Sequence, residues 1–431
     1  MKEKIIIFGG GPCGMRLAEN FIDRGEEVHL YESSDSLGGC WKINWEDGYF
    51  KEHSPRVMTS TYKRVIELVD GLGLKDPYND IYGSSFNSTM MFAKYFLKNL
   101  SFLDSFKFFT SKFFISKSDE RNVKEWMDDN NITTNGRKAI KDLSIALANV
   151  PERVSIYTFF EFASLRGGTF IQFREGDLWL KKWEERLRDK GVKIHFNGKL
   201  NSFHEKNGKV DYAITSKGKV SGDKFLLAIP LWNLKEIMKN CESDKLKNNW
   251  MKSDEFTEFC ENSSYTGLGV QLHFNKITNI DLEKNWCQTC SGDWSIIAQK
   301  TSHYLEKFSK VEGIKEVWSC VIVDFTRKSK RLGATPMKLK KEEIGEEVVY
   351  QLSQALGEKI KPSKITYNLK EKRGGKWDFL ESAYSANKDG WLNPKGSKIK
   401  NIFTIGCHNL WEIAILEGAL KASDRFLDFY Y

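Results

Sequence analysis

The sequence lacks any apolar run of the roughly 18–20 residues that a membrane-spanning helix requires. Because the first predicted strand begins at Lys4, we also expect no apolar leader segment. We therefore expect a soluble, cytoplasmic protein. The 431 residues are 40% hydrophobic and 29% charged. This composition excludes a disordered or fibrous chain, and the length allows several domains of about 100–200 residues each.

Arginine-rich arms and nucleic-acid-binding motifs are also missing, although the net charge is +8. Residues 1–60 contain seven basic and ten acidic residues, a net charge of −3, so the remaining residues carry +11. A surplus of this size is more typical of a solvated, lysine-rich surface than of a nucleic-acid site. We expect a small-molecule substrate as the partner and no nucleic acid. The oligomeric state is left open.

Paired cysteines at metal-site spacing are scarce. The eight cysteines are scattered, and no second pair follows Cys287-x-x-Cys290 at the spacing of a zinc site. Free thiols are therefore favoured over a redox pair or half a metal site. We expect no bound metal.

The first 32 residues have the pattern of one complete β-α-β unit. Residues 4–11 predict a buried parallel strand entering a glycine-rich turn, residues 12–24 a helix, and residues 28–31 a second strand closed by Glu32. The turn satisfies the nucleotide-binding motif G-x-G-x-x-G in the required context, after a strand and before a helix. Its residues are Gly9, Gly10, Gly11, Pro12, Cys13 and Gly14.

Each glycine of this motif has a physical role. Gly9 permits the tight turn, Gly11 lets a pyrophosphate approach the backbone, and Gly14 allows the helix to pack closely on the strand. The helix N-terminus offers N–H groups and the positive end of its dipole to the phosphates. Glu32, 18 residues after Gly14, is placed to accept hydrogen bonds from ribose hydroxyls and to repel a 2′-phosphate.

A second glycine pair, Gly38-Gly39, lies six residues past Glu32 and leads into a segment that ends at Arg56. This order of motifs resembles the N-terminal signature of the FAD-dependent superfamily of flavin amine oxidases, protoporphyrinogen oxidase and phytoene-type desaturases. Residues 190–230 resemble the second FAD segment of that superfamily, and residues 401–419 resemble its closing FAD motif. The resemblance implies FAD as the cofactor.

The resemblance also implies which residues contact FAD. Leu200 would lie near the adenine, and the start of the last helix would face the pyrimidine edge of the flavin. The full set of implied cofactor-binding residues is Gly9, Gly11, Pro12, Cys13, Gly14, Glu32, Ser33, Gly38, Gly39, Cys40, Trp41, Pro55, Arg56, Leu200, Gly406, Cys407, Ile415 and Leu416.

Four positions depart from the family pattern. Cys40 stands where amine oxidases usually have arginine, and its Gly-Gly-x-Trp context is similar to that of flavin monooxygenases. Cys407 stands where the family commonly has an acidic residue. Gly269 occupies the place of the lysine that amine oxidases hold near the flavin, and Ile415 replaces an aromatic residue of the amine-binding cage. The last two departures weaken amine oxidation as the reaction.

Three residues are candidates for catalysis through the resemblance. Arg56 and His53 would lie in the loop that passes the flavin. Arg56 could stabilise a reduced, anionic flavin or, equally, form an ion pair that holds the loop. His53 could act there too, but such a histidine more often makes a structural hydrogen bond. Trp411 could form a wall facing the flavin or pack in the core.

The segment 90–117 is unusually dense in phenylalanine, with lysines interleaved. The phenylalanines spaced as one helical face are Phe92, Phe96, Phe102, Phe106, Phe109 and Phe113. We expect this face to pack on the body of the protein as a helical cap. The alternative is a basic amphipathic surface that makes peripheral contact with a membrane or admits an apolar substrate.

Other segments complete the predicted elements. Residues 192–196, 199–203, 209–215 and 224–229 predict strands of one small sheet, and Asn207-Gly208 marks a hairpin turn. Residues 265–275 and 316–325 alternate like strands of a separate, partly exposed sheet. Residues 177–190, 341–356 and 416–430 predict helices, and residues 400–405 a last buried strand.

We therefore expect an α/β fold with a discontinuous Rossmann-type FAD-binding domain, an inserted α+β substrate domain and a helical cap. The FAD-binding domain would comprise residues 1–60, 166–235 and 376–431, with the cap at 61–165 and the substrate-domain sheet at 236–375. Hydride would pass from a carbon of an amine or an apolar substrate to flavin N5, with reoxidation by oxygen or another acceptor. The alternatives are a flavin monooxygenase or an isoprenoid or lipid desaturase, and a non-catalytic FAD-binding protein.

Overall fold

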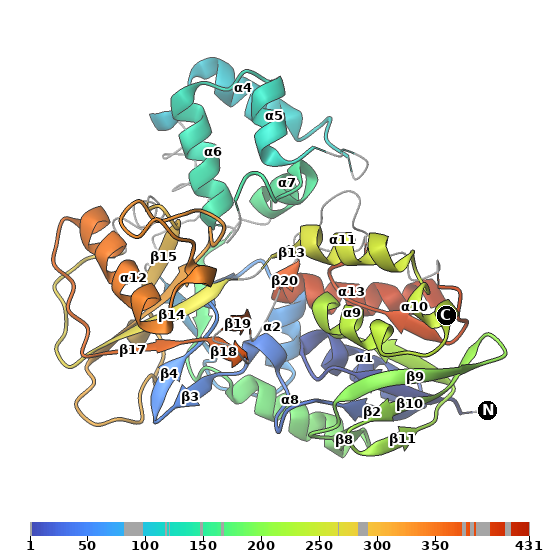
Figure 1. Ribbon diagram of the computed structural model, residues 1–431. Helices are drawn as coiled ribbons and strands as arrows, with labels where there is room; N and C mark the ends of the chain where they lie inside the picture. Colours follow the sequence, from blue (N-terminus) through green and yellow to red (C-terminus); the bar gives the residue numbers. More distant parts are fainter. Residues whose placement is uncertain are drawn as a thin grey trace.

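The chain is seen here in a computed structural model (Figure 1). The structure describes residues 2–81, 98–116, 119, 121–146, 150–164, 168–265, 267–282, 292–372, 376–379, 383–384, 397–409 and 415–430. The predictions for Trp411, for the Cys287-x-x-Cys290 pair and for Phe92 and Phe96 lie outside these residues.

A five-stranded parallel sheet organises the half of the molecule that contains both chain ends (Figure 1). Its strand order is β21-β12-β1-β2-β8, and every neighbouring pair is parallel. The strands are β1 (Lys4–Phe8), β2 (Glu27–Tyr31), β8 (Lys193–His195), β12 (Lys224–Leu227) and β21 (Ile402–Thr404). Segments from the beginning, middle and end of the chain thus meet in one sheet, which confirms the predicted α/β class.

The two faces of this sheet carry different layers, because successive strand residues point to opposite sides. Ile5 and Ile7 pack with helices on one face, whereas Ile6 and Phe8 pack on the other face against a smaller sheet and further helices. The first layer holds α1 (Pro12–Asp23), α2 (Lys63–Asp70), α8 (Leu178–Asp189) and α13 (Leu416–Tyr430). The second holds β9 (Leu200–Lys206), β10 (Lys209–Thr215), β11 (Gly218–Val220), α9 (Leu231–Lys239), α10 (Asp244–Lys247) and α11 (Ser253–Ser263).

The prediction of one small sheet over residues 192–229 is wrong. Strands β8 and β12 join the parallel sheet, and β9, β10 and β11 form an antiparallel sheet of their own. The physical reason is the burial of each strand: three of the four residues of β12 are buried, whereas β10 alternates between buried and outward residues. A strand covered on both faces belongs inside a layered sheet.

A second, antiparallel sheet lies beside the half of the molecule that contains the parallel sheet. Its order is β15 (Ile296–Lys300), β16 (Glu316–Ile322), β14 (Leu268–Phe274) and β17 (Lys364–Tyr367), and α12 (Lys341–Leu356) packs on one face. The expectation that this sheet is partly exposed is wrong, because every residue of β14 and β16 is buried. Its other face is covered by β4 (Tyr49–Lys51) at one end and by cap residues at the other.

Short elements connect these layers. They are η1 (Gly39–Trp41), β3 (Asn44–Glu46), β5 (Met58–Thr59), β6 (Tyr78–Ile81), β7 (Phe170–Phe173), β13 (Ser264–Tyr265), η3 (Thr301–His303), η4 (Pro336–Lys338), β18 (Leu369–Lys372), β19 (Lys376–Phe379) and β20 (Ala383–Tyr384). Strands β5, β7 and β6 form one small sheet, and β3 pairs with β4.

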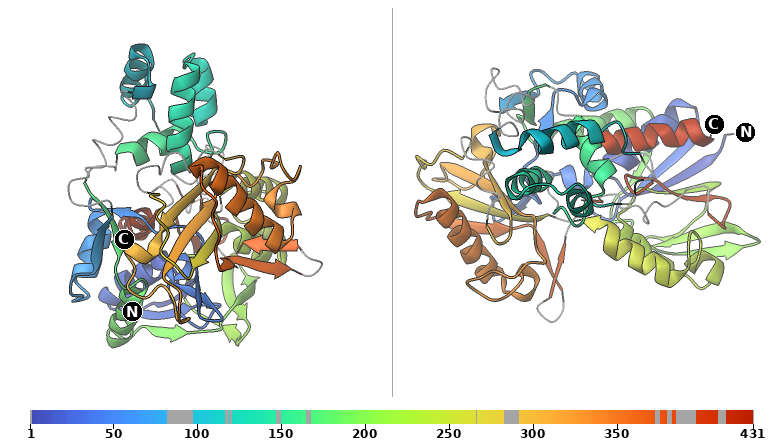
Figure 2. Two further views of the ribbon diagram at one scale, coloured as in Figure 1. Left: turned by 90° about the vertical axis from the view of Figure 1, so that its left-hand side faces the viewer. Right: turned by 90° about the horizontal axis from the view of Figure 1, so that it is seen from above.

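Four helices project from the body as a separate group, which both figures show (Figures 1 and 2). They are α4 (Phe102–Ser111), α5 (Val123–Asp129), α6 (Thr134–Ala146) and α7 (Ile156–Ser164). Phe108, Trp126 and Phe159 anchor the core that they share. No helix within the described residues is both long enough and apolar enough to cross a bilayer.

The predicted packing of the phenylalanine face is wrong for the residues of this group. Phe102, Phe106, Phe109 and Phe113 are exposed, and Phe108 is the residue that is buried. The reason is that α4 turns a different stripe inward, in which Asp104 is buried and hydrogen-bonded to Thr133. A buried carboxylate needs such partners, so its contacts fix the rotation of the helix.

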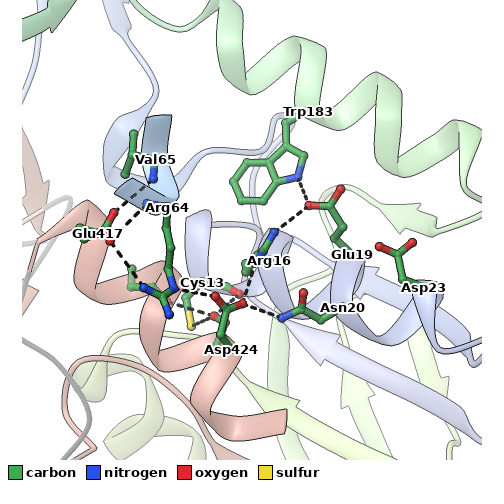
Figure 3. A network of polar contacts seen from close by, with 12 residues as sticks. Cys13, Arg16, Glu19, Asn20, Asp23, Arg64, Val65, Trp183, Glu417 and Asp424 are labelled. Carbon is green, nitrogen blue, oxygen red and sulfur yellow. Dashed lines mark hydrogen bonds and ion pairs between the residues drawn. The ribbon is translucent and has the colours of Figure 1, made fainter. Parts of the chain in front are cut away.

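Helix α13 is joined to α1 and α2 by one carboxylate (Figure 3). Asp424 accepts hydrogen bonds from Arg16 Nε at 2.8 Å, Asn20 Nδ2 at 3.0 Å and Arg64 Nε at 2.8 Å. Burial by itself would raise the pKa of Asp424, but the hydrogen bonds from Arg16 and Asn20 and the charge of Arg16 outweigh it and lower that pKa. Asp424 is therefore ionised in the folded protein at neutral pH.

A second carboxylate of α13 caps α2 from outside that helix. Glu417 is buried and accepts hydrogen bonds from the backbone N–H groups of Arg64 at 3.3 Å and Val65 at 3.1 Å. Both groups lie in the first turn of α2, where N–H groups have no partner within the helix. The C-terminal helix is thus tied to both α1 and α2 in the layer on this face of the sheet.

We expect Asp424→Asn to lower the free energy of unfolding at pH 7 by about 2 kcal/mol, because three donors lose an ionised acceptor. The folded pKa of Asp424 is below its ordinary value of 3.8. Its stabilisation is therefore complete above that value and is lost as the pH falls through the folded pKa. Urea unfolding at pH 7 and in acid measures both effects.

Asp244→Asn is the matched control, because it removes the same charge from a side chain that is 89% exposed. Equal stability of the two variants at pH 7 would contradict the role given to Asp424.

Candidate functional site

Two glycines shape the turn between β1 and α1. Gly9 has a φ of +104°, and an ideal Cβ there would lie 2.2 Å from the carbonyl oxygen of Ala228. An ideal Cβ on Gly14 would lie 1.8 Å from the carbonyl oxygen of Gly9. The start of α1 therefore packs directly on the backbone at the end of β1, at a distance that only glycine permits.

A second glycine turn, between β2 and η1, faces the first. The N–H of Gly38 donates to the carbonyl oxygen of Gly10 at 2.8 Å. An ideal Cβ on Gly39 would lie 3.1 Å from Cα of Gly11, and one on Gly11 would meet nothing closer than Cα of Gly39 at 3.9 Å. We call this pair of facing turns, residues 9–11 and 38–39, the glycine cradle.

The first turn of α1 opens into the glycine cradle. Gly11 is the N-cap residue, with no side chain to occupy the helix end, and Pro12 begins the helix. The N–H groups of a first helical turn have no acceptor within the helix, and the helix dipole adds positive charge there. A backbone cradle at such a helix end fits the pyrophosphate of a dinucleotide, so the residues present fit FAD.

Glu32 lies beside the cradle and is buried. Its Oε2 accepts the N–H of Gly10 at 2.7 Å, and its Oε1 accepts the N–H of Ser34 at 2.8 Å and the hydroxyl of Ser33 at 3.0 Å. The carboxylate is thus fixed at the carboxyl end of β2, within reach of the turn that would hold the pyrophosphate. This position suits a ribose acceptor.

Arg56 anchors the loop that follows the cradle. Its Nη2 donates to the carbonyl oxygen of Lys42 at 2.6 Å and to that of Cys40 at 3.3 Å. Its Nε lies 3.3 Å from Glu52 Oε2, with both side chains buried, and its guanidinium lies 6.0 Å from the centre of the Trp41 ring. Arg56 was expected either to stabilise a reduced flavin or to form an ion pair that holds the loop, and the structure contains such an ion pair.

Gly269 on β14 lies directly against the next part of this loop. An ideal Cβ at this position would be 1.9 Å from the carbonyl oxygen of Glu52 and 2.8 Å from Cα of His53. A lysine at 269 would therefore require the 52–53 backbone to move. This close contact places the backbone of His53 against β14 of the second sheet.

The closing motif follows β21. Gly406 donates its N–H to Asn409 Oδ1 at 2.9 Å, and an ideal Cβ on it would lie 2.8 Å from the His408 ring. The Nε2 of His408 lies 2.6 Å from Thr404 Oγ1, and burial lowers the pKa of His408 to about 3. His408 is therefore a neutral packing residue at physiological pH, and Cys407 beside it is half-buried.

The side chain of Cys13 turns away from the cradle toward α13. Ser423 Oγ donates to the carbonyl oxygen of Cys13 at 2.9 Å, and Cys13 Sγ lies 3.5 Å from the carbonyl oxygen of Ile405. Burial raises the pKa of this thiol to about 12, so it is protonated and unreactive at neutral pH. A contribution of Cys13 to a nucleotide would come from its backbone N–H.

The structure brings some predicted site residues together and places others in the core. Gly9, Gly11, Pro12, Gly14, Glu32, Ser33, Gly38, Gly39, Cys40 and Trp41 gather around the cradle. Leu200 packs in the core with Tyr31 and Phe8. Ile415 and Leu416 pack at the start of α13 against the core that contains Met15. Pro55 is half-buried beside Arg56.

One cross-strand row was not predicted from the sequence. Gln299, Ser319 and Gln271 stand side by side on β15, β16 and β14, and all three are buried. The two amide ends of Gln299 and the Oε1 of Gln271 have no hydrogen-bond partner within the described residues. The alternation of Gln271 and His273 with apolar residues along strand 268–274 is the signal that could have revealed the row.

The row lies on the face of the sheet that packs against the loop ending at Arg56. Gln271 Nε2 donates to the carbonyl oxygen of Glu52 at 2.8 Å. On the same face, Val321 packs with Ile145 and Val150 of the cap region, and Val317 packs with Phe50 of β4. The polar row is therefore flanked by two apolar contacts. Buried, unpartnered amides call for a ligand or water at that point.

The comparisons with known proteins agree with this geometry. Residues 12–425 match the family described as flavin containing amine oxidoreductase. A protein assigned as a protoporphyrinogen oxidase from Exiguobacterium sp. 255-15 has a TM-score of 0.66 at 14% identity, with 100% of this chain and 99% of that chain covered. Putrescine oxidase bound to putrescine has a TM-score of 0.64 at 13% identity, with 100% and 99% covered. At these identities the two structures establish the fold alone.

Similarity to curated proteins is local. N,N-dimethylglycine/sarcosine dehydrogenase from Chromohalobacter salexigens is 47% identical over 38 residues. The match covers 9% of this chain and 6% of that enzyme. Because so little of that enzyme is matched, the comparison carries no information on the substrate of this chain.

We expect Gly11→Ala to leave the free protein folded but to prevent FAD binding. The added Cβ meets nothing closer than 3.9 Å in the protein, yet it projects into the cradle where the pyrophosphate would approach. Gly14→Ala is the contrasting variant, because its Cβ clashes with backbone at 1.8 Å and should disturb the fold itself. Thermal unfolding of the apoproteins and flavin content after FAD incubation separate the two cases.

Retention of normal flavin by Gly11→Ala, at unchanged stability, would remove the glycine cradle from the cofactor site.

Proposed function

The chain belongs to the flavin containing amine oxidoreductase family, and on this basis we propose that it oxidises a small molecule by hydride transfer from a substrate carbon. It is an FAD-dependent oxidoreductase. When bound, FAD would supply the hydride acceptor at N5 of its ring, and oxygen or another compound would be the final electron acceptor. The observation that carries the proposal is the glycine cradle beside buried Glu32, a constellation that fits the ADP half of FAD.

The chain's own residues would hold FAD in three ways. The cradle and the first turn of α1 would bind the pyrophosphate through backbone N–H groups. Glu32 would exchange part of its hydrogen bonding for the ribose hydroxyls. The remaining proposed contacts lie in the loop at Cys40, Trp41 and Pro55, near Leu200, and in the closing segment at Gly406, Cys407, Ile415 and Leu416.

We propose that residues 1–60, 166–235 and 376–431 form the FAD-binding domain, and that residues 236–375 supply the substrate-domain sheet. The strand order supports this division, because the parallel sheet draws its strands from the first three ranges. Residues 61–165 would form the cap. Its helices α4 to α7 share a core of their own, while α2 packs on α13 and ties the start of this range to the FAD-binding part.

Arg56 would act as a positioning residue rather than a group that touches substrate. Its guanidinium is committed to Lys42, Cys40 and Glu52. It would therefore set the path of the loop that passes the flavin. We propose that His53 helps to hold the same loop in place where it passes Gly269. The prediction that Trp411 forms a wall facing the flavin remains a prediction.

The substrate side of the site lies on the second sheet. Since Gly269 leaves no room for a side chain, a lysine-assisted reaction at this position is not part of the proposal. The Gln299–Ser319–Gln271 row would instead contact a polar group of the substrate, because its buried amides offer both donors and acceptors. An amine, hydroxyl or carboxylate on an otherwise apolar molecule would satisfy it.

The decisive experiment is anaerobic mixing of the FAD-loaded protein with a panel of amines, polyamines and lipids. We expect one class to bleach the absorption band of the oxidised flavin, with the colour restored on admission of oxygen or another acceptor. Bleaching by dithionite, but by no compound of a broad panel, would instead favour a non-catalytic flavoprotein.

We expect Gln299→Leu to raise KM by about 10-fold or more with the substrate so found, since a lost hydrogen bond to a buried group is worth about 1–3 kcal/mol. The side chain is only 5% exposed and both its amide ends lack partners. Replacing it by leucine should therefore not lower stability. Gln354→Leu, on the exposed side of α12, is the matched control.

An unchanged KM for Gln299→Leu together with higher stability would show that the row is a structural defect and not a contact to substrate.

A further inference from the structure

The cap presents a continuous apolar surface to solvent, which the oxidoreductase function does not use. It consists of six large residues that are between 55% and 90% exposed. We call it the Phe face; its members are Phe102, Leu103, Phe106, Phe109, Phe113 and Phe114. Isolated exposed apolar residues are ordinary, but a group gathered on one helix and the turn after it marks an interaction site.

Polar contacts on the opposite stripe hold the Phe face outward. Asp104 is buried and accepts hydrogen bonds from the N–H and the hydroxyl of Thr133. Lys107 Nζ donates to the carbonyl oxygen of Asn130 at 2.6 Å. A rotation of α4 that buried the phenylalanines would break these contacts and expose Phe108, so the outward orientation is built into the cap.

Further polar contacts fix the same orientation along the whole of α4. Trp126 Nε1 donates to Ser111 Oγ at 3.2 Å near the end of the helix, and Ser101 caps its start by accepting the N–H of Asp104 at 3.0 Å. Phe108 packs inward between Trp126 and Phe160. The helix is therefore anchored at both ends and in the middle.

The charge around the Phe face is positive. Residues 98–116 contain the cations Lys98, Lys107 and Lys112 and one anion, the buried Asp104, a net of +2. Lys98 and Lys112 are exposed. Two of the three acidic residues of the adjoining helix α5 are in ion pairs, Asp128 with Lys124 and Arg137, and Asp129 with Arg121. The third, Glu125, caps the start of α5 by accepting the N–H of Asn122.

We propose that the Phe face is a membrane-docking surface, which inserts its phenylalanines at the headgroup boundary of a bilayer containing anionic lipid. An amphipathic helix with an apolar stripe flanked by lysines binds such an interface through apolar burial and charge together. Helix α4, which carries the Phe face, lies at the outer end of the cap, away from the parallel sheet (Figures 1 and 2).

A second copy of the chain is a poorer occupant. A ten-residue helix is only about 15 Å long, so a dimer would have to cover nearly the whole Phe face to reach the roughly 800 Å² per partner that a stable interface buries. In a symmetric dimer the same lysines would also meet across the axis, so that like charges would oppose each other.

The test is co-flotation of the FAD-loaded protein with vesicles of phosphatidylcholine, with and without phosphatidylserine. We expect binding to the anionic vesicles that weakens with added salt but is not abolished by it. The variant Phe102→Ser/Phe106→Ser/Phe109→Ser should lose affinity by about 100-fold, because three rings no longer enter the interface. Its thermal stability and flavin content should be unchanged, since all three rings are exposed in the free protein.

The matched control is Ile214→Ser/Ile277→Ser/Tyr350→Ser, which removes three exposed apolar side chains elsewhere on the molecule. This control should bind vesicles as the wild type does, and Lys98→Gln/Lys112→Gln should lose the preference for anionic vesicles. Absence of wild-type binding, or equal loss in both triple variants, would overturn the proposal. So would a dimer in sedimentation that the Phe variant dissociates, because the occupant would then be a second copy.

Discussion

The close approach of two backbone turns is the constraint on which the rest of the molecule depends. The turns after β1 and β2 meet at Gly11 and Gly39, and a hydrogen bond from Gly38 to Gly10 holds them together. At position 39 this approach requires glycine, because φ is +52° and an ideal Cβ would lie 3.1 Å from Cα of Gly11. A side chain at Gly11 would instead enter the space at the N-terminus of α1. The loop that leaves the second turn is then secured by Arg56, whose ion pair and carbonyl contacts set its path toward the second sheet.

The remaining elements bring distant parts of the chain to this point. Helix α13 is bound to α1 through Asp424 and caps α2 through Glu417, so it ties together two helices from the beginning of the chain. The second sheet rests on the 52–53 backbone at Gly269 and brings its polar row to the same region. Cofactor and substrate would thus meet where three separate stretches of sequence converge.

The local sequence pattern predicted individual helices and turns well, but it did not predict which strands pair with one another. The helices of residues 341–356 and 416–430 and the hairpin at Asn207-Gly208 follow from periodicity and turn chemistry, and the structure has them at those positions. Sheet membership over 192–229 could not be predicted, because it depends on which strands are covered on both faces.

The orientation of α4 was also beyond the sequence pattern. The phenylalanine spacing identified one face, but the partners of Asp104 decide that this face points outward. At the site, the glycine motif and Glu32 could be placed from spacing. Two features of the site depend on how β14 and β15 pack against other segments, and could not be predicted from spacing. They are the close contact of Gly269 with the backbone of Glu52 and the unpartnered amide of Gln299.

We propose that the glycine cradle and Glu32 together bind the ADP half of FAD. Calorimetric titration of the apoprotein with FAD and with FMN measures this directly, because FMN has the same ring but lacks the adenylate and therefore the pyrophosphate. The account predicts that FAD binds with one site per chain and that FMN binds at least about 100-fold more weakly. Equal affinity for the two flavins, or no binding of FAD, would contradict it.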